Sequence, residues 1–162
     1  MSMKVLESLK DAGATYEVID CEPSFADTAE FCNHYGYSLD ESANAILLEG
    51  KAESPVYALC VVLATTRINV NKVARKRLGT RKASFASAEV TKSLTGMEIG
   101  GVTPVGLPDD LPIWIDNLVM EATKVIIGAG SRDAKIYLAP ENLLRLPNTH
   151  IVKGLSMPIV NK

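Results

Sequence analysis

The sequence contains few of the residues that build metal centres and disulfide frameworks. Its 162 residues include three cysteines and two histidines. Cys21, Cys32 and Cys60 show no CxxC spacing, whereas a structural zinc site usually takes four Cys or His ligands in close sequence pairs. This composition argues against a zinc site and against a disulfide framework. Cys60 lies inside an apolar run, where a free thiol usually packs as a small hydrophobic side chain.

Long apolar segments are also missing. The longest apolar run, residues 57–64, is much shorter than the roughly 20 residues that cross a bilayer. The first residues lead directly into an amphipathic segment, with no apolar region of the kind found in secretory signals. We therefore expect a cytoplasmic protein that does not associate with a membrane.

The remaining composition is that of an ordinary globular domain. Hydrophobic residues make up 47% of the chain and charged residues 22%, with a net charge of −2. A chain of this length can bury one core, and the sequence shows no internal repeat or linker. We expect a single domain over residues 1–162.

Helical spacing of apolar residues alternates with short β-type runs along the chain. Helices are predicted at 2–12, 27–35, 39–43, 69–78 and 87–94, with another beginning at Pro140. Strands are predicted at 15–19, 45–48, 56–64, 113–116, 124–127, 135–138 and 150–152, and 153–162 receive no assignment. An Asp27–Glu30 capping box should start the second helix. Short strands between helices predict an α/β fold of the α+β type with a mixed sheet.

Most sequence signatures of catalysis are absent. There is no GxSxG, HExxH, Walker loop or GxGxxG. Gly128-Ala129-Gly130-Ser131 begins like a dinucleotide-binding loop, but Asp133 stands where the third glycine belongs. We interpret this segment as a tight turn between two strands.

Residues 67–82 form a basic segment with seven Lys or Arg residues and no Asp or Glu. Two interpretations are open. The segment could be a solvated helix face, with cations favoured near the helix C-terminus. It could also contact a phosphate backbone, and such binding would depend strongly on salt.

Residues 95–106 are rich in glycine, with the adjacent pair Gly100–Gly101 followed by Pro104. Adjacent glycines permit positive φ and close approach of the backbone to a ligand, and proline stiffens the chain after them. Such a loop can direct free backbone N–H groups at one point, the arrangement that stabilises an oxyanion during ester hydrolysis. The alternative is a loop that only turns the chain.

Several of these motifs, in order, resemble the YbaK / prolyl-tRNA-synthetase-associated domain family. Residues 95–104 resemble the family's TG…GGVSP stretch, and Gly100 to Pro104 match its GxxxP motif. Three further segments resemble the family strand that ends in Asp, its glycine turn and its SPEDL helix start, namely residues 113–116, 128–131 and 139–143. The resemblance covers roughly residues 3–152.

The resemblance implies a mixed, β-barrel-like sheet flanked by helices, with a pocket near the GxxxP loop. It implies hydrolysis of the ester of a mischarged aminoacyl-tRNA, by a positioned water or the tRNA's own hydroxyl, with no metal ion or organic cofactor. The tRNA acceptor end would lie across the pocket mouth, and an aminoacyl-tRNA synthetase is a candidate partner. The residues expected to meet tRNA phosphates are Lys72, Arg75, Lys76 and Arg77.

The resemblance also assigns site residues. Those expected to shape catalysis are Gly100, Gly101, Thr103 and Pro104. Those expected to bind substrate are Asn44, Thr28, Val102, Asp116, Gly128 and Ser131.

One position departs from the family pattern. Many members have Lys-Thr before an apolar strand, as in AKTLL, but residues 43–47 here are Ala-Asn-Ala-Ile-Leu. Asn44 therefore stands at the lysine position, where it can hydrogen-bond but brings no positive charge. Lys51 lies beyond the strand. Three alternatives remain: a lysine-independent deacylase, an enzyme for a different ester, and a binding module that has lost catalysis.

Overall fold

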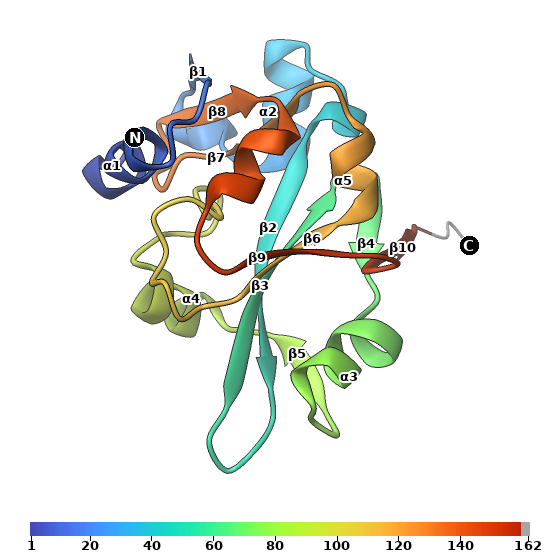
Figure 1. Ribbon diagram of the computed structural model, residues 1–162. Helices are drawn as coiled ribbons and strands as arrows, with labels where there is room; N and C mark the ends of the chain where they lie inside the picture. Colours follow the sequence, from blue (N-terminus) through green and yellow to red (C-terminus); the bar gives the residue numbers. More distant parts are fainter. Residues whose placement is uncertain (160–162) are drawn as a thin grey trace.

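The computed structural model of the protein describes residues 1–159, whose strands form three sheets of five, three and two strands. Helices cover these sheets from several sides (Figure 1). This is the mixed α/β architecture that the sequence predicts. The sheets do not close into a barrel within the described residues, because a single isolated bridge, Ser42 to Ile126, joins the five- and three-stranded sheets.

The five-stranded sheet is built around a long antiparallel pair, β2 (Ala43–Gly50) and β3 (Val56–Leu63), which runs through the middle of the molecule (Figure 1). β5 (Ala83–Phe85) pairs antiparallel with the C-terminal end of β2. β6 (Ile113–Asp116) adds parallel to β3, and β9 (Thr149–Val152) adds parallel to β6. The predicted mixed sheet is therefore confirmed, with strand order β5-β2-β3-β6-β9.

The smaller sheets complete the fold. β7 (Val125–Gly128) and β8 (Ala134–Leu138) form an antiparallel hairpin, which confirms the tight turn predicted between them, and β1 (Glu17–Asp20) pairs with β8. β4 (Thr66–Ile68) pairs with β10 (Ser156–Pro158). β10 lies in the C-terminal segment that the sequence leaves unassigned, and positions 160–162 lie outside the described residues.

Three predicted helices are present as α1 (Met3–Asp11), α2 (Thr28–Tyr35) and α4 (Ala88–Thr95). The predicted capping box of α2 is wrong, because the Asp27 side chain makes no capping hydrogen bond. Its carboxylate instead accepts a hydrogen bond from Arg132, 3.2 Å away. None of the described helices is long and apolar enough to span a bilayer.

The other helical segments are short. Those predicted around residues 39–43, 69–78 and Pro140 appear as η2 (Leu39–Glu41), as a π-helical turn η3 (Val70–Ala74) continued by α3 (Arg75–Leu78), and as η4 (Pro140–Arg145). Two were not predicted, namely η1 (Pro23–Phe25) and α5 (Asn117–Glu121).

Strand β3 is buried on both faces. Leu59 and Val61 pack into the main core, whereas Cys60 and Val62 pack into a second core on the opposite face. Burial on both faces explains why residues 57–64 read as one continuous apolar run. Burial also raises the pKa of Cys60 to about 12, so its thiol stays protonated inside the sheet, as expected for a packing residue.

Candidate active site

A cavity of about 210 Å³ lies where the five- and three-stranded sheets meet. Its walls come from β2, the start of α2, α4, the loop at residues 99–102 and the ends of β7 and β8. This volume is below the roughly 300–1,000 Å³ of sites for drug-sized ligands, so it suits a small group such as an aminoacyl side chain. The polar side chains on its wall are Asp27, Thr28, Ser42, Asn44, Thr91 and Lys135.

The glycine-rich loop forms one wall of the cavity. Gly100 has a φ of +92°, and a Cβ there would collide with Arg132 Nη1 and lie 3.1 Å from Asp27 Oδ1. A Cβ on Gly101 would lie 2.8 Å from the Ser131 backbone. Positive φ at one glycine and close packing at the next explain why two adjacent glycines occur here.

Arg132, in the turn between β7 and β8, fastens this loop to the start of α2. Its Nη1 donates to the Ile99 carbonyl oxygen at 2.7 Å and to Asp27 at 3.2 Å. Its Nε and Nη2 donate to the Pro23 carbonyl oxygen at 3.2 and 2.8 Å. One guanidinium thus sets the position of two cavity walls.

The backbone N–H groups of the loop differ in availability. The Gly101 N–H donates to the Glu98 carbonyl oxygen at 2.9 Å, and the Gly101 carbonyl accepts from Gly130 at 2.8 Å. By contrast, the N–H groups of Gly100 and Val102 have no acceptor in the part of the chain that the structure describes. Both residues line the cavity. The free donors expected of this loop therefore belong to Gly100 and Val102 and not to Gly101.

Asn44 is oriented by a neighbouring hydroxyl. Thr28 Oγ1 donates to Asn44 Oδ1 at 2.6 Å, which joins the start of α2 to β2. The amide oxygen is engaged in this bond, and the amide nitrogen of Asn44 has no acceptor among the described residues. Asn44 therefore presents N–H donors at the cavity wall.

Lys135 brings a positive charge to the cavity that the sequence analysis missed. It is 6% exposed, and its Nζ donates to the Gly100 carbonyl oxygen at 2.8 Å and lies 5.7 Å from the centre of the Phe31 ring. Burial lowers the pKa of the Lys135 ammonium below the usual lysine range. Lys51, in contrast, follows the far end of β2 and pairs with Glu49.

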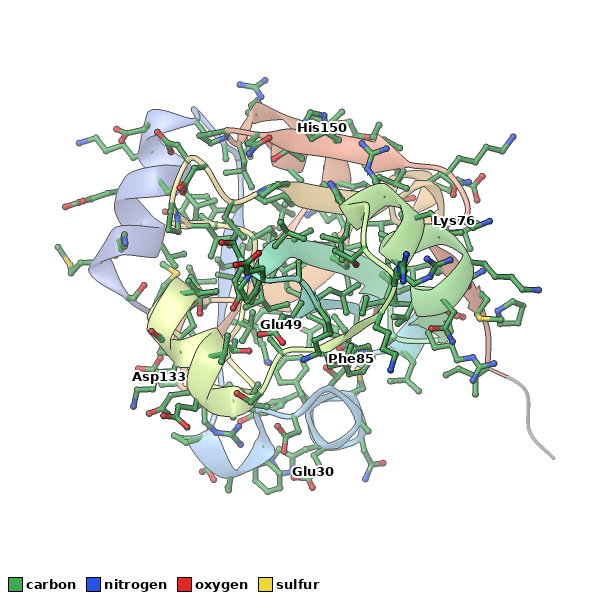
Figure 2. The ribbon with its side chains drawn as sticks, turned by 90° about the horizontal axis from the view of Figure 1, so that it is seen from below. Glu30, Glu49, Lys76, Phe85, Asp133 and His150 are labelled. Atoms are coloured by element: carbon green, nitrogen blue, oxygen red, sulfur yellow. The ribbon has the colours of Figure 1, made fainter. Side chains whose placement is uncertain are left out.

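The basic segment forms a surface on and around α3. Its seven cations have no ion-pair partner within residues 1–159. Lys72 and Lys76 are exposed, and Figure 2 shows Lys76 on α3 near the edge of the molecule. Arg75 donates to the carbonyl oxygens of Asn71 in η3 and Thr80 after α3, and the Arg77 guanidinium lies 5.1 Å from the centre of the Trp114 ring.

Strand β5 connects this basic surface to the cavity. Ala83 lines a shallow depression together with three basic side chains of the segment. Three residues later, the Ala86 N–H donates to the carbonyl oxygen of Leu47, a cavity residue. Three residues of extended chain span about 10 Å. Phe85, labelled in Figure 2, lies between them and is 54% exposed.

Residues 22–146 match the family model of the aminoacyl-tRNA editing domain. The chain belongs to this family. The match confirms the predicted family and, at the level of aminoacyl-tRNA editing, the predicted class of function.

Two curated relatives are similar to this editing domain in sequence. The chain is 30% identical over 127 residues to the uncharacterized protein YwhH of Bacillus subtilis, and the match covers 78% of each chain. Over 99 residues it is 29% identical to EbsC of Enterococcus faecalis, named "Putative Cys-tRNA(Pro)/Cys-tRNA(Cys) deacylase", and this match covers 61% of this chain and 58% of EbsC.

Two solved structures have the same fold. One, described as "a putative trans-editing enzyme for prolyl tRNA synthetase", gives a TM-score of 0.78 at 22% identity and covers 94% of this chain and 97% of its own. The other, described as hypothetical protein APE2540, gives a TM-score of 0.84 at 24% identity and covers 95% and 99%. Both confirm the predicted fold.

The editing domain brings half of the predicted site residues to the cavity. Those that line it are Thr28, Asn44, Gly100, Val102 and Gly128. Gly128 packs closely, since a Cβ there would collide with the Val102 carbonyl oxygen.

The other predicted residues do not line the cavity. Thr103 is fully buried, and its hydroxyl has no hydrogen-bond partner among the described residues. Asp116 is also fully buried and accepts from the backbone N–H and the hydroxyl of Ser156, at 3.1 and 2.5 Å. Ser131 donates to Asp133 at 2.5 Å. Gly101 and Pro104 are buried within the loop. Through its two bonds to Ser156, Asp116 anchors the C-terminal segment in this structure.

Proposed function

We propose that this editing domain is a trans-editing hydrolase that cleaves the ester bond of a mischarged aminoacyl-tRNA. One observation carries the proposal: Asn44, Gly100 and Val102, whose N–H groups have no acceptor among the described residues, line one small cavity together with Lys135. The family match supports the reaction class, and the name of EbsC supports a deacylase.

In the proposed reaction, the aminoacyl side chain enters the cavity and the ester lies against the Gly100 loop. A water oxygen bonds to the carbonyl carbon, and the carbonyl oxygen takes up negative charge. The bond from the carbonyl carbon to the ribose oxygen then breaks, and the ribose oxygen takes the proton that the water gives up. Donors fixed in advance stabilise the developing oxyanion without reorganisation. We place the donors at Asn44 and at the backbone of Gly100 and Val102.

The proposal uses no metal ion. Among the described residues that line the cavity, Asp27 is the one carboxylate, and none is His or Cys. A single exposed carboxylate is a poor donor set for a catalytic metal, which usually takes three protein ligands.

The tRNA would approach over β5. Its phosphates would meet the basic surface, where Lys72 and Lys76 stand without ion-pair partners among the described residues, and an unpaired base could stack on Phe85. The acceptor end would then cover the remaining distance of about 10 Å along β5 to the cavity. We place this activity in the cytoplasm, with an aminoacyl-tRNA synthetase as partner. The structural neighbour described as a trans-editing enzyme for prolyl tRNA synthetase supports the latter.

A second function, a non-catalytic aminoacyl-tRNA binding module, is favoured by one observation. Asn44 stands on β2 where the family pattern has a lysine, and it brings no charge. This module would bind tRNA in a salt-sensitive manner and leave the ester intact.

The experiment that separates the two functions measures hydrolysis of alanyl-, seryl- and cysteinyl-tRNA, each correctly and wrongly charged. An editing hydrolase accelerates the hydrolysis of at least one mischarged tRNA over the rate in buffer and leaves the correctly charged form intact. Tight binding in a filter assay with no acceleration supports the binding module. Failure to bind or hydrolyse any of these tRNAs would overturn both functions.

A further inference from the structure

We propose that Lys135 is a catalytic residue of this site, whose ammonium contacts the ester carbonyl oxygen and stabilises its charge during hydrolysis. The inference rests on the proposed function. Lys135 is the one cationic side chain among the described residues that line the cavity. It comes from β8 of the three-stranded sheet, whereas Asn44 comes from β2 of the five-stranded sheet, so two different sheets bring a cation and an amide to one cavity.

The environment of Lys135 leaves part of its hydrogen-bonding capacity free. An ammonium has three donors, and one is used by the Gly100 carbonyl oxygen. The others have no acceptor among the described residues, and no carboxylate of those residues lies within 4.0 Å. The Phe31 ring, 5.7 Å away, contributes a cation–π contact. Burying an ammonium without a carboxylate partner lowers the stability of the fold, and charged groups in such unfavourable environments are common at functional sites.

The charged and titratable groups around Lys135 come from three sides. Asp27 is the N-cap residue of α2 and Cys32 lies within that helix, Cys21 precedes η1, and Arg132 lies in the turn between β7 and β8. Asp27 forms an ion pair with Arg132, so its negative charge is already partly neutralised. Lys135 therefore lacks a counter-ion of its own among the described residues, and a developing oxyanion in the cavity would supply one.

The test replaces Lys135 by methionine, which keeps the length of the side chain and removes the charge. The matched control is Lys124→Met, because Lys124 also places its ammonium 5.1 Å from an aromatic ring, that of Tyr137, but lies outside the cavity. In steady-state assays, Lys135→Met is expected to lower kcat about 10²–10³-fold, the usual effect of losing one oxyanion donor, with KM changed less than about threefold. Lys124→Met is expected to retain the wild-type rate.

Thermal unfolding separates a catalytic role from a structural one. Replacing a buried, unpaired charge by an apolar side chain is expected to leave Tm unchanged or higher. A structural lysine would instead lower Tm and activity together. The wild-type kcat should also fall as the pH rises through the lowered pKa of Lys135, below the usual lysine range, and Lys135→Met should lack this limb.

Wild-type rate in Lys135→Met would overturn this inference and leave the proposed function standing. A wild-type protein that hydrolyses none of the charged tRNAs would remove the proposed function and the inference with it. If Lys135→Met does not fold, Lys135→Gln takes its place, since it also removes the charge but keeps a hydrogen-bond donor, and a wild-type kcat in that variant contradicts a catalytic ammonium.

Discussion

Replacing Gly100 by alanine tests whether the glycine-rich loop shapes the active site. The substitution causes both backbone strain and a steric clash. Alanine is strained at the φ of +92°, and its Cβ would occupy the place of Arg132 Nη1. Arg132 would have to withdraw from Ile99 and Asp27, which frees the loop from the start of α2.

The expected loss of stability is moderate. A non-glycine residue in the left-handed region costs about 1–2 kcal/mol. Loss of the Arg132 bond to the Ile99 carbonyl adds about 1 kcal/mol, whereas the bond to Asp27 adds little because that carboxylate is more than half exposed. The free energy of unfolding should therefore fall by about 2–3 kcal/mol. The rate of hydrolysis should fall more than this loss of stability alone would cause, because the loop also positions the Gly100 N–H and Lys135.

The matched control for Gly100→Ala is Gly154→Ala. Gly154 has a φ of +75°, an added Cβ there would meet no atom within 4 Å, and the residue lies outside the cavity. This variant should lose about 1–2 kcal/mol from backbone strain alone and keep its catalytic rate. Urea denaturation measures the stability, and single-turnover deacylation measures the rate. Equal rates and equal stabilities for the two variants would refute the proposed role of the loop.

Three further substitutions probe separate parts of the site. Thr28→Val removes the hydroxyl that orients Asn44, so kcat should fall about tenfold while unfolding free energy drops by only about 0.5–1.5 kcal/mol; an unchanged kcat would contradict a role for the oriented amide. Lys76→Ala should weaken tRNA binding and reduce the slope of log affinity against log salt by about 1, as measured by filter binding. Phe85→Ala should weaken binding of the acceptor end by about 1–3 kcal/mol if a base stacks there, and unchanged affinity would exclude that stacking.

Sequence predicted those elements whose signals are local. Helices α1 and α4 begin at serines whose hydroxyls accept from backbone N–H groups three residues on, the usual capping pattern. The glycine-rich loop was also visible, because positive φ and close packing leave a clear mark in the sequence. These features depend on neighbours in the chain and need no knowledge of the tertiary fold.

Features that depend on distant partners were missed. Asp27 has the local pattern of a helix cap, but its carboxylate is taken by Arg132, far away in the sequence. Strand alternation places Lys135 on the same face as Tyr137, opposite Ile136, which is typical of a solvent-facing lysine. Only the packing of Phe31 and α2 over that face turns Lys135 into a buried cavity residue.

Short strands were missed for a related reason. β4, β5 and β10 have three residues each, too few for an alternation pattern to emerge. They form because longer partners or each other supply hydrogen bonds across the fold. β5 matters for function, since it connects the basic surface to the cavity.

The most direct test of the central claim is single-turnover hydrolysis of mischarged tRNA by the wild-type protein beside Gly100→Ala. The proposed mechanism predicts that the wild type accelerates ester cleavage well above the rate in buffer and that Gly100→Ala loses most of this acceleration. A wild-type rate equal to that in buffer would contradict an editing hydrolase. Equal acceleration by both proteins would show that cleavage does not depend on the Gly100 loop.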